Sequence, residues 1–239
     1  MSPSRLRAPF SFVAVFILLG CAAAPPHRAD PETARIARAY GIREFDRIEA
    51  IRYTFNVRLP DREIARSWIW EPGPDRVTFA GAGENAEPIT YLRNERDPAG
   101  PKPDPQIDAW FVNDNFWLLF PFHIQWTPDL TVDSAENQPL PLSEGRARRV
   151  TVRFPANRGY TPGDAYDLYL DPDHRIAQWV YRKGGAETPA RAATWENHAK
   201  AGPILLALDH RGEGGFRVRF TDVAVRLKGS ADWLPALIL

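Results

Sequence analysis

The sequence predicts a mainly β fold (α+β) built from antiparallel strands with a few short helices. Strand-like runs outnumber helical patterns by about eight to two or three, and no alternation of strand, helix and strand is present. The 239 residues are 44% hydrophobic, which is enough for one sizeable core. Eight tryptophans suit either a thick β core or a surface for flexible apolar ligands.

The predicted domain begins with one short helix. Asp30 is a good N-cap, Pro31 suits the first helical position, and Gly41 is a plausible stop. From Ile51 to Leu59 the period changes to two, as in an antiparallel strand with one wet face. The alternation predicts two sets of side chains: Tyr53, Phe55 and Val57 on the concave, buried face, and Arg52, Asn56 and Arg58 on the convex, solvated face.

The remaining strands are read from the same kind of pattern. They are expected at 64–70, 77–79, 89–92, 149–154, 165–170, 176–182, 204–209 and 216–227. A change of parity predicts a bulge near Thr221 and Asp222, and Asp171 to His174 has the composition of a hairpin turn. Residues 81–105 are poor in pattern, as in a long connection that serves a binding edge or a lid.

The segment from Trp110 to Trp126 is the densest apolar stretch of the predicted domain. Five consecutive apolar residues, 116–120, are too crowded for a strand with one wet face. A short helix from about Asp114 to Phe120, stopped by Pro121, accounts for them. Such a helix is apolar on all sides, so it is either a plug of the core or a lid over a lipid-sized cavity.

The N-terminus resembles a bacterial lipoprotein signal. An apolar run from Phe10 to Leu19 follows two arginines and ends in Leu18-Leu19-Gly20-Cys21, a pattern similar to the lipobox. The alternative is an ordinary signal peptide followed by an incidental cysteine. We expect a signal peptide at 1–20, a lipidated tether at 21–30, a folded domain at 31–228 and a C-terminal tail at 229–239. The lipobox resemblance implies that Cys21 is lipidated and anchors the chain to a membrane of the bacterial cell envelope. Ala22 after the cysteine implies that this membrane is the outer one, with the lipoprotein facing the periplasm.

Charge and composition narrow the function classes. The chain has 30 basic and 30 acidic residues, and loss of Arg5 and Arg7 with the signal leaves 28 and 30, a net charge of −2. This balance argues against nucleic acid as a partner. The single cysteine permits no intramolecular disulfide.

Catalytic motifs are weak. The histidines are dispersed, and neither a nucleophile elbow nor a phosphate-binding glycine loop is present. We therefore expect no enzyme, no catalytic residue and no cofactor. An acidic cluster around residues 164–173 makes calcium conceivable, but acidic turns between strands are common, so no metal site is predicted.

The residues 113–122, Asn-Asp-Asn-Phe-Trp-Leu-Leu-Phe-Pro-Phe, resemble a motif of uncharacterised LolA-like envelope proteins. Together with the lipobox, the N-terminal helix and the strand–turn–strand around Asp171, they make residues 31–228 similar to the LolA/LolB-like superfamily. The resemblance implies an unclosed antiparallel β-barrel, a half-barrel covered by short helices, with an apolar cavity for acyl chains. The arginine-based gate of the carrier and the leucine loop of the receptor have no identifiable counterpart here.

Two functions remain open at this point. One is binding of a lipid, an acyl chain or another apolar ligand in the half-barrel. The expected ligand-binding residues are Tyr53, Phe55, Trp68, Trp70, Trp117, Leu118, Phe120, Phe122 and Trp179. The other is a structural or interaction protein of the envelope, with a barrel filled by its own side chains and a protein partner at its edge. A cavity of hundreds of cubic ångströms favours the first function, whereas water-sized voids favour the second.

Overall fold

The structure, a computed structural model, describes residues 30–81, 87–93, 104–157 and 161–239. The lipobox and most of the predicted tether lie outside the described residues. The described helices are α1 (Pro31–Ala39) and α2 (Pro105–Trp126), with 3₁₀ helices at Ile42–Arg47, Lys183–Gly185 and Glu213–Gly215. None of the helices in these ranges is both long enough and apolar enough to cross a bilayer.

Two antiparallel sheets carry the fold. The strands of the first half are β1 (Ile48–Leu59), β2 (Arg62–Glu71), β3 (Arg76–Phe79), β4 (Ile89–Leu92), β5 (Thr131–Pro139), β6 (Arg146–Arg153) and β7 (Ala165–Leu170). Those of the second half are β8 (Ile176–Arg182), β9 (Arg191–Thr194), β10 (Glu196–Ala201), β11 (Ile204–Arg211), β12 (Arg217–Leu227), β13 (Trp233–Pro235) and β14 (Leu237–Ile238). Sheet A has the order β14-β10-β11-β12-β1-β2-β3-β4, with β13 beside β12, and sheet B has the order β5-β6-β7-β8-β9.

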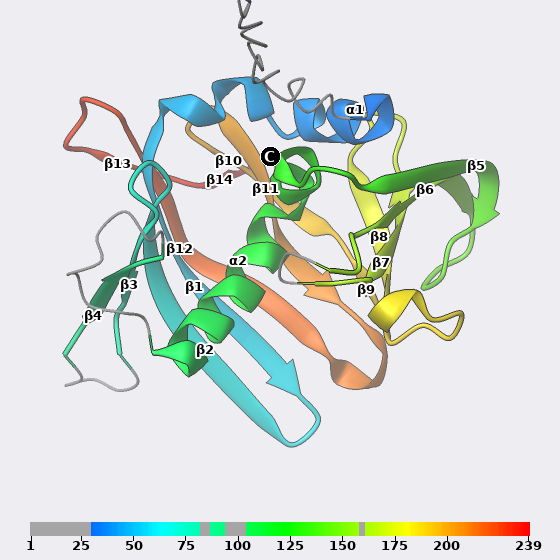
Figure 1. The fold of residues 1–239 in the computed structure, drawn as a ribbon, viewed down its shortest axis with the longest axis horizontal. Coiled ribbons are helices and arrows are strands. Elements are labelled where there is room, and N and C mark those ends of the chain that lie inside the picture. Colours follow the sequence, from blue (N-terminus) through cyan, green and yellow to red (C-terminus); the bar gives the residue numbers. More distant parts are fainter. Residues whose placement is uncertain (1–29, 82–86, 94–103, 158–160) are drawn as a thin grey trace, which may run out of the picture.

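The two sheets follow one another around a curved surface. Only Trp195 separates β9 from β10, and its backbone N–H donates to the Ala177 carbonyl at 2.8 Å. The chain therefore passes from sheet B to sheet A almost as one strand. Since β4 and β5 do not pair, the barrel is unclosed. Helix α2, which connects β4 to β5 in the sequence, crosses the concave side (Figure 1). This arrangement confirms the predicted half-barrel covered by short helices.

The alternation in β1 is confirmed at most positions. Tyr53 and Phe55 are buried, whereas Arg52 and Arg58 are exposed. Val57 is only partly buried, because it lies near the hairpin end of the strand. The pairing of β1 with β12 shifts register opposite 222–223, and Asp222 has a φ of 55°, which confirms the expected bulge.

Helix α2 is much longer than the predicted Asp114–Phe120, and Pro121 does not stop it. The side chain of Asp104 accepts hydrogen bonds from the backbone N–H groups of Gln106 and Ile107, so the helix begins at Pro105, nine residues earlier than predicted. Pro121 instead kinks the helix, and Leu119 has a non-helical φ and ψ of −113° and 17°. Burial of aromatic side chains on both sides of the kink keeps the second half helical.

Five strands, β5, β9, β10, β13 and β14, have no counterpart in the sequence prediction. Strand β5 lies at a sheet edge and is polar, so it shows no apolar alternation. The C-terminal segment, expected as a tail, adds β13 beside β12 and β14 beside β10. Residues 233–238 are therefore part of sheet A.

Candidate binding cavity

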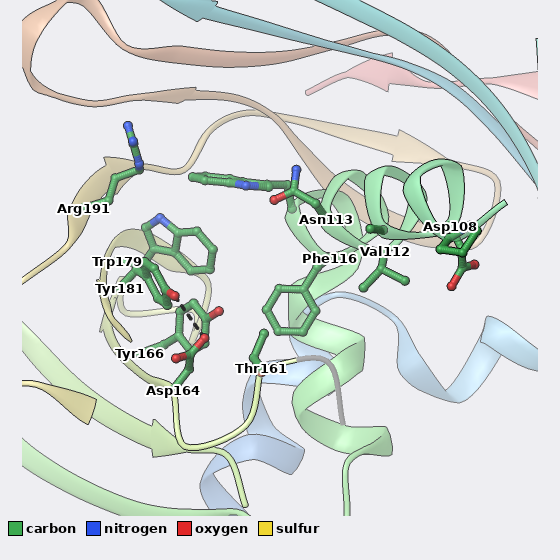
Figure 2. Close-up of a pocket in the computed structure, with 13 residues that line it drawn as sticks. Asp108, Val112, Asn113, Phe116, Thr161, Asp164, Tyr166, Trp179, Tyr181 and Arg191 are labelled. Atoms are coloured by element: carbon green, nitrogen blue, oxygen red, sulfur yellow. Dashed lines mark hydrogen bonds between the residues drawn. The ribbon is translucent and has the colours of Figure 1, made fainter. Parts of the chain in front are cut away.

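A cavity of about 590 Å³ lies between α2 and sheet B (Figure 2). Residues from one side of α2, from β7, from β8 and from the start of β9 line it. They are Pro105, Asp108, Ala109, Val112, Asn113, Phe116, Trp117, Thr161, Asp164, Tyr166, Trp179, Tyr181 and Arg191. The volume is in the range of sites for small organic ligands, about 300–1,000 Å³.

Aromatic rings form the main wall of this cavity. Tyr166 stacks on Trp179 and on Tyr181, with ring centroids 5.0 and 5.2 Å apart. Trp117 meets Trp179 edge to face at 4.6 Å, and Phe116 lies 5.7 Å from Tyr166. Because the rings pack on one another, the apolar wall is formed before any ligand arrives.

Few polar groups face the cavity. The buried carboxylate of Asp164 accepts hydrogen bonds from the Tyr181 hydroxyl at 3.0 Å and from the backbone N–H of Gly184 at 2.7 Å. Burial, together with this hydrogen bond and the negative charge of Asp164, raises the pKa of Tyr181 to about 12. Asp108 accepts from Nε of Arg93 at 2.7 Å. The guanidinium of Arg191 lies over the Phe216 ring, 3.8 Å from its centroid.

The structure brings two of the predicted ligand-binding residues, Trp117 and Trp179, together in the cavity wall. Phe120 is fully buried directly behind them, with its ring 5.0 Å from Trp179 and 4.9 Å from Tyr166. The other six are core residues that do not line this cavity: Tyr53, Phe55, Trp68, Trp70, Leu118 and Phe122.

Trp70 instead borders a second cavity of about 510 Å³ at the other end of α2. Phe45, His123 and Trp126 also line it, and the Phe122 and Trp126 rings stack beside it at 5.8 Å. Its remaining wall contains several charged side chains: Asp46, Asp75, Arg93 and Lys228. An acyl chain in this cavity would contact more charged groups than in the first, so we take the first as the candidate site.

Sequence reasoning missed Tyr166, Tyr181 and Arg191 as site residues. The two tyrosines are register partners in β7 and β8, both predicted strands, so their pairing could have been found. Arg191 opens β9, which shows no strand pattern in the sequence.

The acidic cluster around residues 164–173 does not converge on one point. Asp167 pairs with Arg182 at 2.8 Å, and Asp171 accepts from the backbone N–H groups of Asp173 and Arg175 in the hairpin turn. In the part of the chain that the structure describes, no three His, Cys, Asp or Glu side chains form a group that could hold a metal ion.

On its opposite side, α2 is attached to sheet A by a buried ion pair. Arg66 donates from Nε and Nη2 to the two oxygens of Asp114 at 2.7 and 2.6 Å. Trp68 Nε1 and Asn113 Nδ2 donate to the same carboxylate at 2.9 and 3.0 Å. Burial raises the pKa of Asp114, and the Arg66 hydrogen bonds and charge oppose that shift. The pair joins α2 to sheet A on the side of the helix away from the cavity.

No family model and no curated protein matches the chain. The solved structures similar to it include the following two. One is a DUF1329 family protein from Desulfovibrio piger, at 10% identity and a TM-score of 0.44, over 85% of this chain and 96% of that one. The other is a putative outer membrane lipoprotein-sorting protein domain from Vibrio parahaemolyticus, at 9% identity and a TM-score of 0.39, over 84% and 95%. Similarities at this level carry no information about the ligand.

Proposed function

We propose that this chain is a non-enzymatic binding protein of the bacterial envelope that holds an acyl chain or a similar apolar ligand between α2 and sheet B. One observation carries the proposal: the cavity of about 590 Å³ has a mainly aromatic wall and fewer charged side chains than the second cavity of about 510 Å³. A purely structural barrel has no need of such a space, because protein interiors otherwise pack to crystal-like density.

Binding at this wall is driven by burial of apolar surface. Each additional methylene that enters the cavity contributes about 0.8 kcal/mol, which corresponds to about fourfold in affinity. For an uncharged chain the affinity depends little on salt, because no ion pair forms. The polar groups of the wall, such as Asp164, keep their hydrogen bonds within the protein.

The test uses straight-chain alcohols of about eight to sixteen carbons as uncharged probes. Binding is measured through the fluorescence of the tryptophans, since Trp117 and Trp179 line the cavity. We expect the dissociation constant to fall steadily with chain length until the cavity is full. No binding at micromolar concentration would instead favour a structural or interaction protein of the envelope.

A filling variant and a matched control sharpen the test. Ala109 is an exposed residue of α2 that lines the cavity, so Ala109→Trp should obstruct it and weaken binding at least about tenfold. Gln106 is exposed on the same helix but does not line the cavity, so Gln106→Trp should bind like the wild type. Equal binding by both variants would place the ligand elsewhere.

We further propose that Cys21 is lipidated and holds the domain at the outer membrane, facing the periplasm. The support is the sequence Leu18-Leu19-Gly20-Cys21 after an apolar run. The Cys21→Ser variant should no longer incorporate a palmitate analogue and should leave the membrane fraction. Undiminished incorporation of the palmitate analogue by that variant would contradict the lipoprotein interpretation and leave the cavity proposal unaffected.

A further inference from the structure

We propose that the ligand of this cavity is a single-chain amphiphile with an anionic head, of the fatty-acid type. Its head binds the guanidinium of Arg191 and the indole N–H of Trp179, and its chain lies along the aromatic wall. This inference rests on the proposed function, since it names the chemical class that the same cavity takes.

Arg191 is a cation at the cavity without an anionic partner. Among the described residues its side chain forms no ion pair and no hydrogen bond, and its guanidinium lies over the ring of Phe216. That contact holds the guanidinium beside the cavity opening. Arg191 is an exposed residue, and partial burial lowers the pKa of its guanidinium, with no carboxylate beside it to oppose the shift. An anionic ligand would place the missing negative charge beside the guanidinium of Arg191.

Trp179 supplies a second unused donor. Its side chain is 2% exposed, and Nε1 has no hydrogen-bond partner among the described residues. The indole nitrogen can only donate, and a buried donor without an acceptor is costly. Figure 2 shows this nitrogen on the edge of the ring that faces Arg191. A carboxylate or phosphate between the two groups would satisfy both.

The two carboxylates that line the cavity away from Arg191 already have partners within the protein. Asp164 lies beyond Tyr181 on the side away from Arg191 (Figure 2). Both of its oxygens accept hydrogen bonds, from Tyr181 and Gly184, and Asp108 at the rim is paired with Arg93. A cationic head therefore finds no unused carboxylate. The two unsatisfied donors favour an anionic head at the Arg191 end, with its chain running along Trp179, Tyr166 and Phe116.

The experiment compares three probes with the same sixteen-carbon chain: palmitate, hexadecyl phosphate and hexadecanol. At low salt we expect the wild type to bind at least one of the two anions at least about tenfold more tightly than the alcohol, because charge-assisted hydrogen bonds are stronger than neutral ones. This preference should shrink as salt is added. A preference for palmitate or for the phosphate identifies which anionic head is used.

The Arg191→Gln variant should weaken binding of the anion much more than binding of hexadecanol, and so lose the preference for the anion. Arg219→Gln is the matched control: it removes the same charge at an exposed position of β12 that does not line this cavity, and it should bind all three probes like the wild type. The Trp179→Phe variant keeps an aromatic ring without the donor, and it should bind the anion at least about threefold more weakly. Thermal unfolding checks that each variant is folded.

The outcomes separate this inference from the proposed function. If the wild type binds hexadecanol as tightly as both anions, the anionic head is wrong and the apolar cavity stands. The inference also fails if Arg191→Gln weakens all three probes alike, since Arg191 would then be only part of the wall. If the folded wild type binds none of the probes, both proposals fail.

Discussion

The two sides of α2 differ in how they meet the sheet. Towards sheet A the helix is in close contact, with Phe111 packed on Trp68 at 5.4 Å and Asp114 bound to Arg66. Towards sheet B, Phe120 packs on Tyr166 and Trp179, but the cavity of about 590 Å³ lies beside this contact and Trp117 is only partly buried. One helix is therefore both a plug of the core and the cover of a cavity.

This difference resolves a choice that the sequence leaves open. The apolar segment 116–120 fits a core helix or a lid equally well. In the structure its residues divide: Leu118, Leu119 and Phe120 are fully buried, and Phe116 and Trp117 reach the cavity. The stability of the domain should therefore depend on the first group, and ligand binding on the second.

The largest effect is expected at Phe120, which is fully buried behind the cavity wall. Phe120→Asp places a carboxylate among Phe116, Tyr166 and Trp179, and it should lower the free energy of unfolding by at least about 4 kcal/mol. Trp117→Asp, at a partly buried position of the same helix, should keep the β-sheet circular dichroism signal and lose alcohol binding. If both variants unfold alike, α2 is a plug on both sides and the comparison fails.

The next effect concerns the ion pair that attaches α2 to sheet A. Asp114→Asn removes the charge and leaves the Arg66 guanidinium, itself largely buried, without its anion. We expect a loss of about 3 kcal/mol in urea unfolding, because breaking a buried pair costs more than the pair contributes.

A double variant is the control for this prediction. Arg66→Met together with Asp114→Leu removes both charges and should recover most of the loss. Hexadecanol binding by the double variant should be close to that of the wild type, because neither residue lines the cavity. A loss below about 1 kcal/mol for Asp114→Asn would show that the pair does not fix the helix.

The sequence predicts the strands whose residues alternate and misses those that do not. Strand β1 is predicted because its buried face is aromatic and aliphatic. Strand β5 is polar and is a strand because it pairs with β6. The extent of α2 is missed because proline normally ends a helix, and here burial on both sides of the kink outweighs that preference.

The candidate site was predictable only in part. Trp117 and Trp179 are found because large aromatic residues are expected at an apolar wall. Arg191 and the pair of Arg66 with Asp114 depend on which residues far apart in the sequence become neighbours. No local pattern contains that information.

The third prediction uses a residue between the two regions. His210 is fully buried, with its ring 5.4 Å from Trp117 and 6.0 Å from Phe220, and its Nδ1 is 3.2 Å from the Thr194 carbonyl. Burial lowers its pKa to about 4, below the ordinary value of 6.5, although the Thr194 carbonyl and Asp209 oppose the shift. The unfolded chain therefore binds a proton more readily than the folded one between pH 6.5 and 4.

Stability should accordingly fall as the pH is lowered through this window, by about 2 kcal/mol from this residue between pH 7 and pH 5. Urea unfolding across the range measures the slope. His210→Phe should remove most of this contribution, whatever it does to stability at pH 7. The slope that remains belongs in part to His123 and His198, whose pKa values burial also lowers. An unchanged slope in His210→Phe would show that this side chain is not buried in its neutral form.

The smallest expected effect is a control for the ion pair under α2. Arg58 and Glu63 join β1 to β2 with Nε and Oε1 2.5 Å apart, the same chemistry as Arg66 with Asp114, but their side chains are 59% and 67% exposed. Water screens such a pair, and fixing two long side chains offsets much of the attraction. Glu63→Gln should therefore change the free energy of unfolding by less than about 0.5 kcal/mol. A loss as large as that of Asp114→Asn would mean that burial is not what distinguishes the two pairs, and the contrast between the filled interior and the rest of the half-barrel would lose its physical basis.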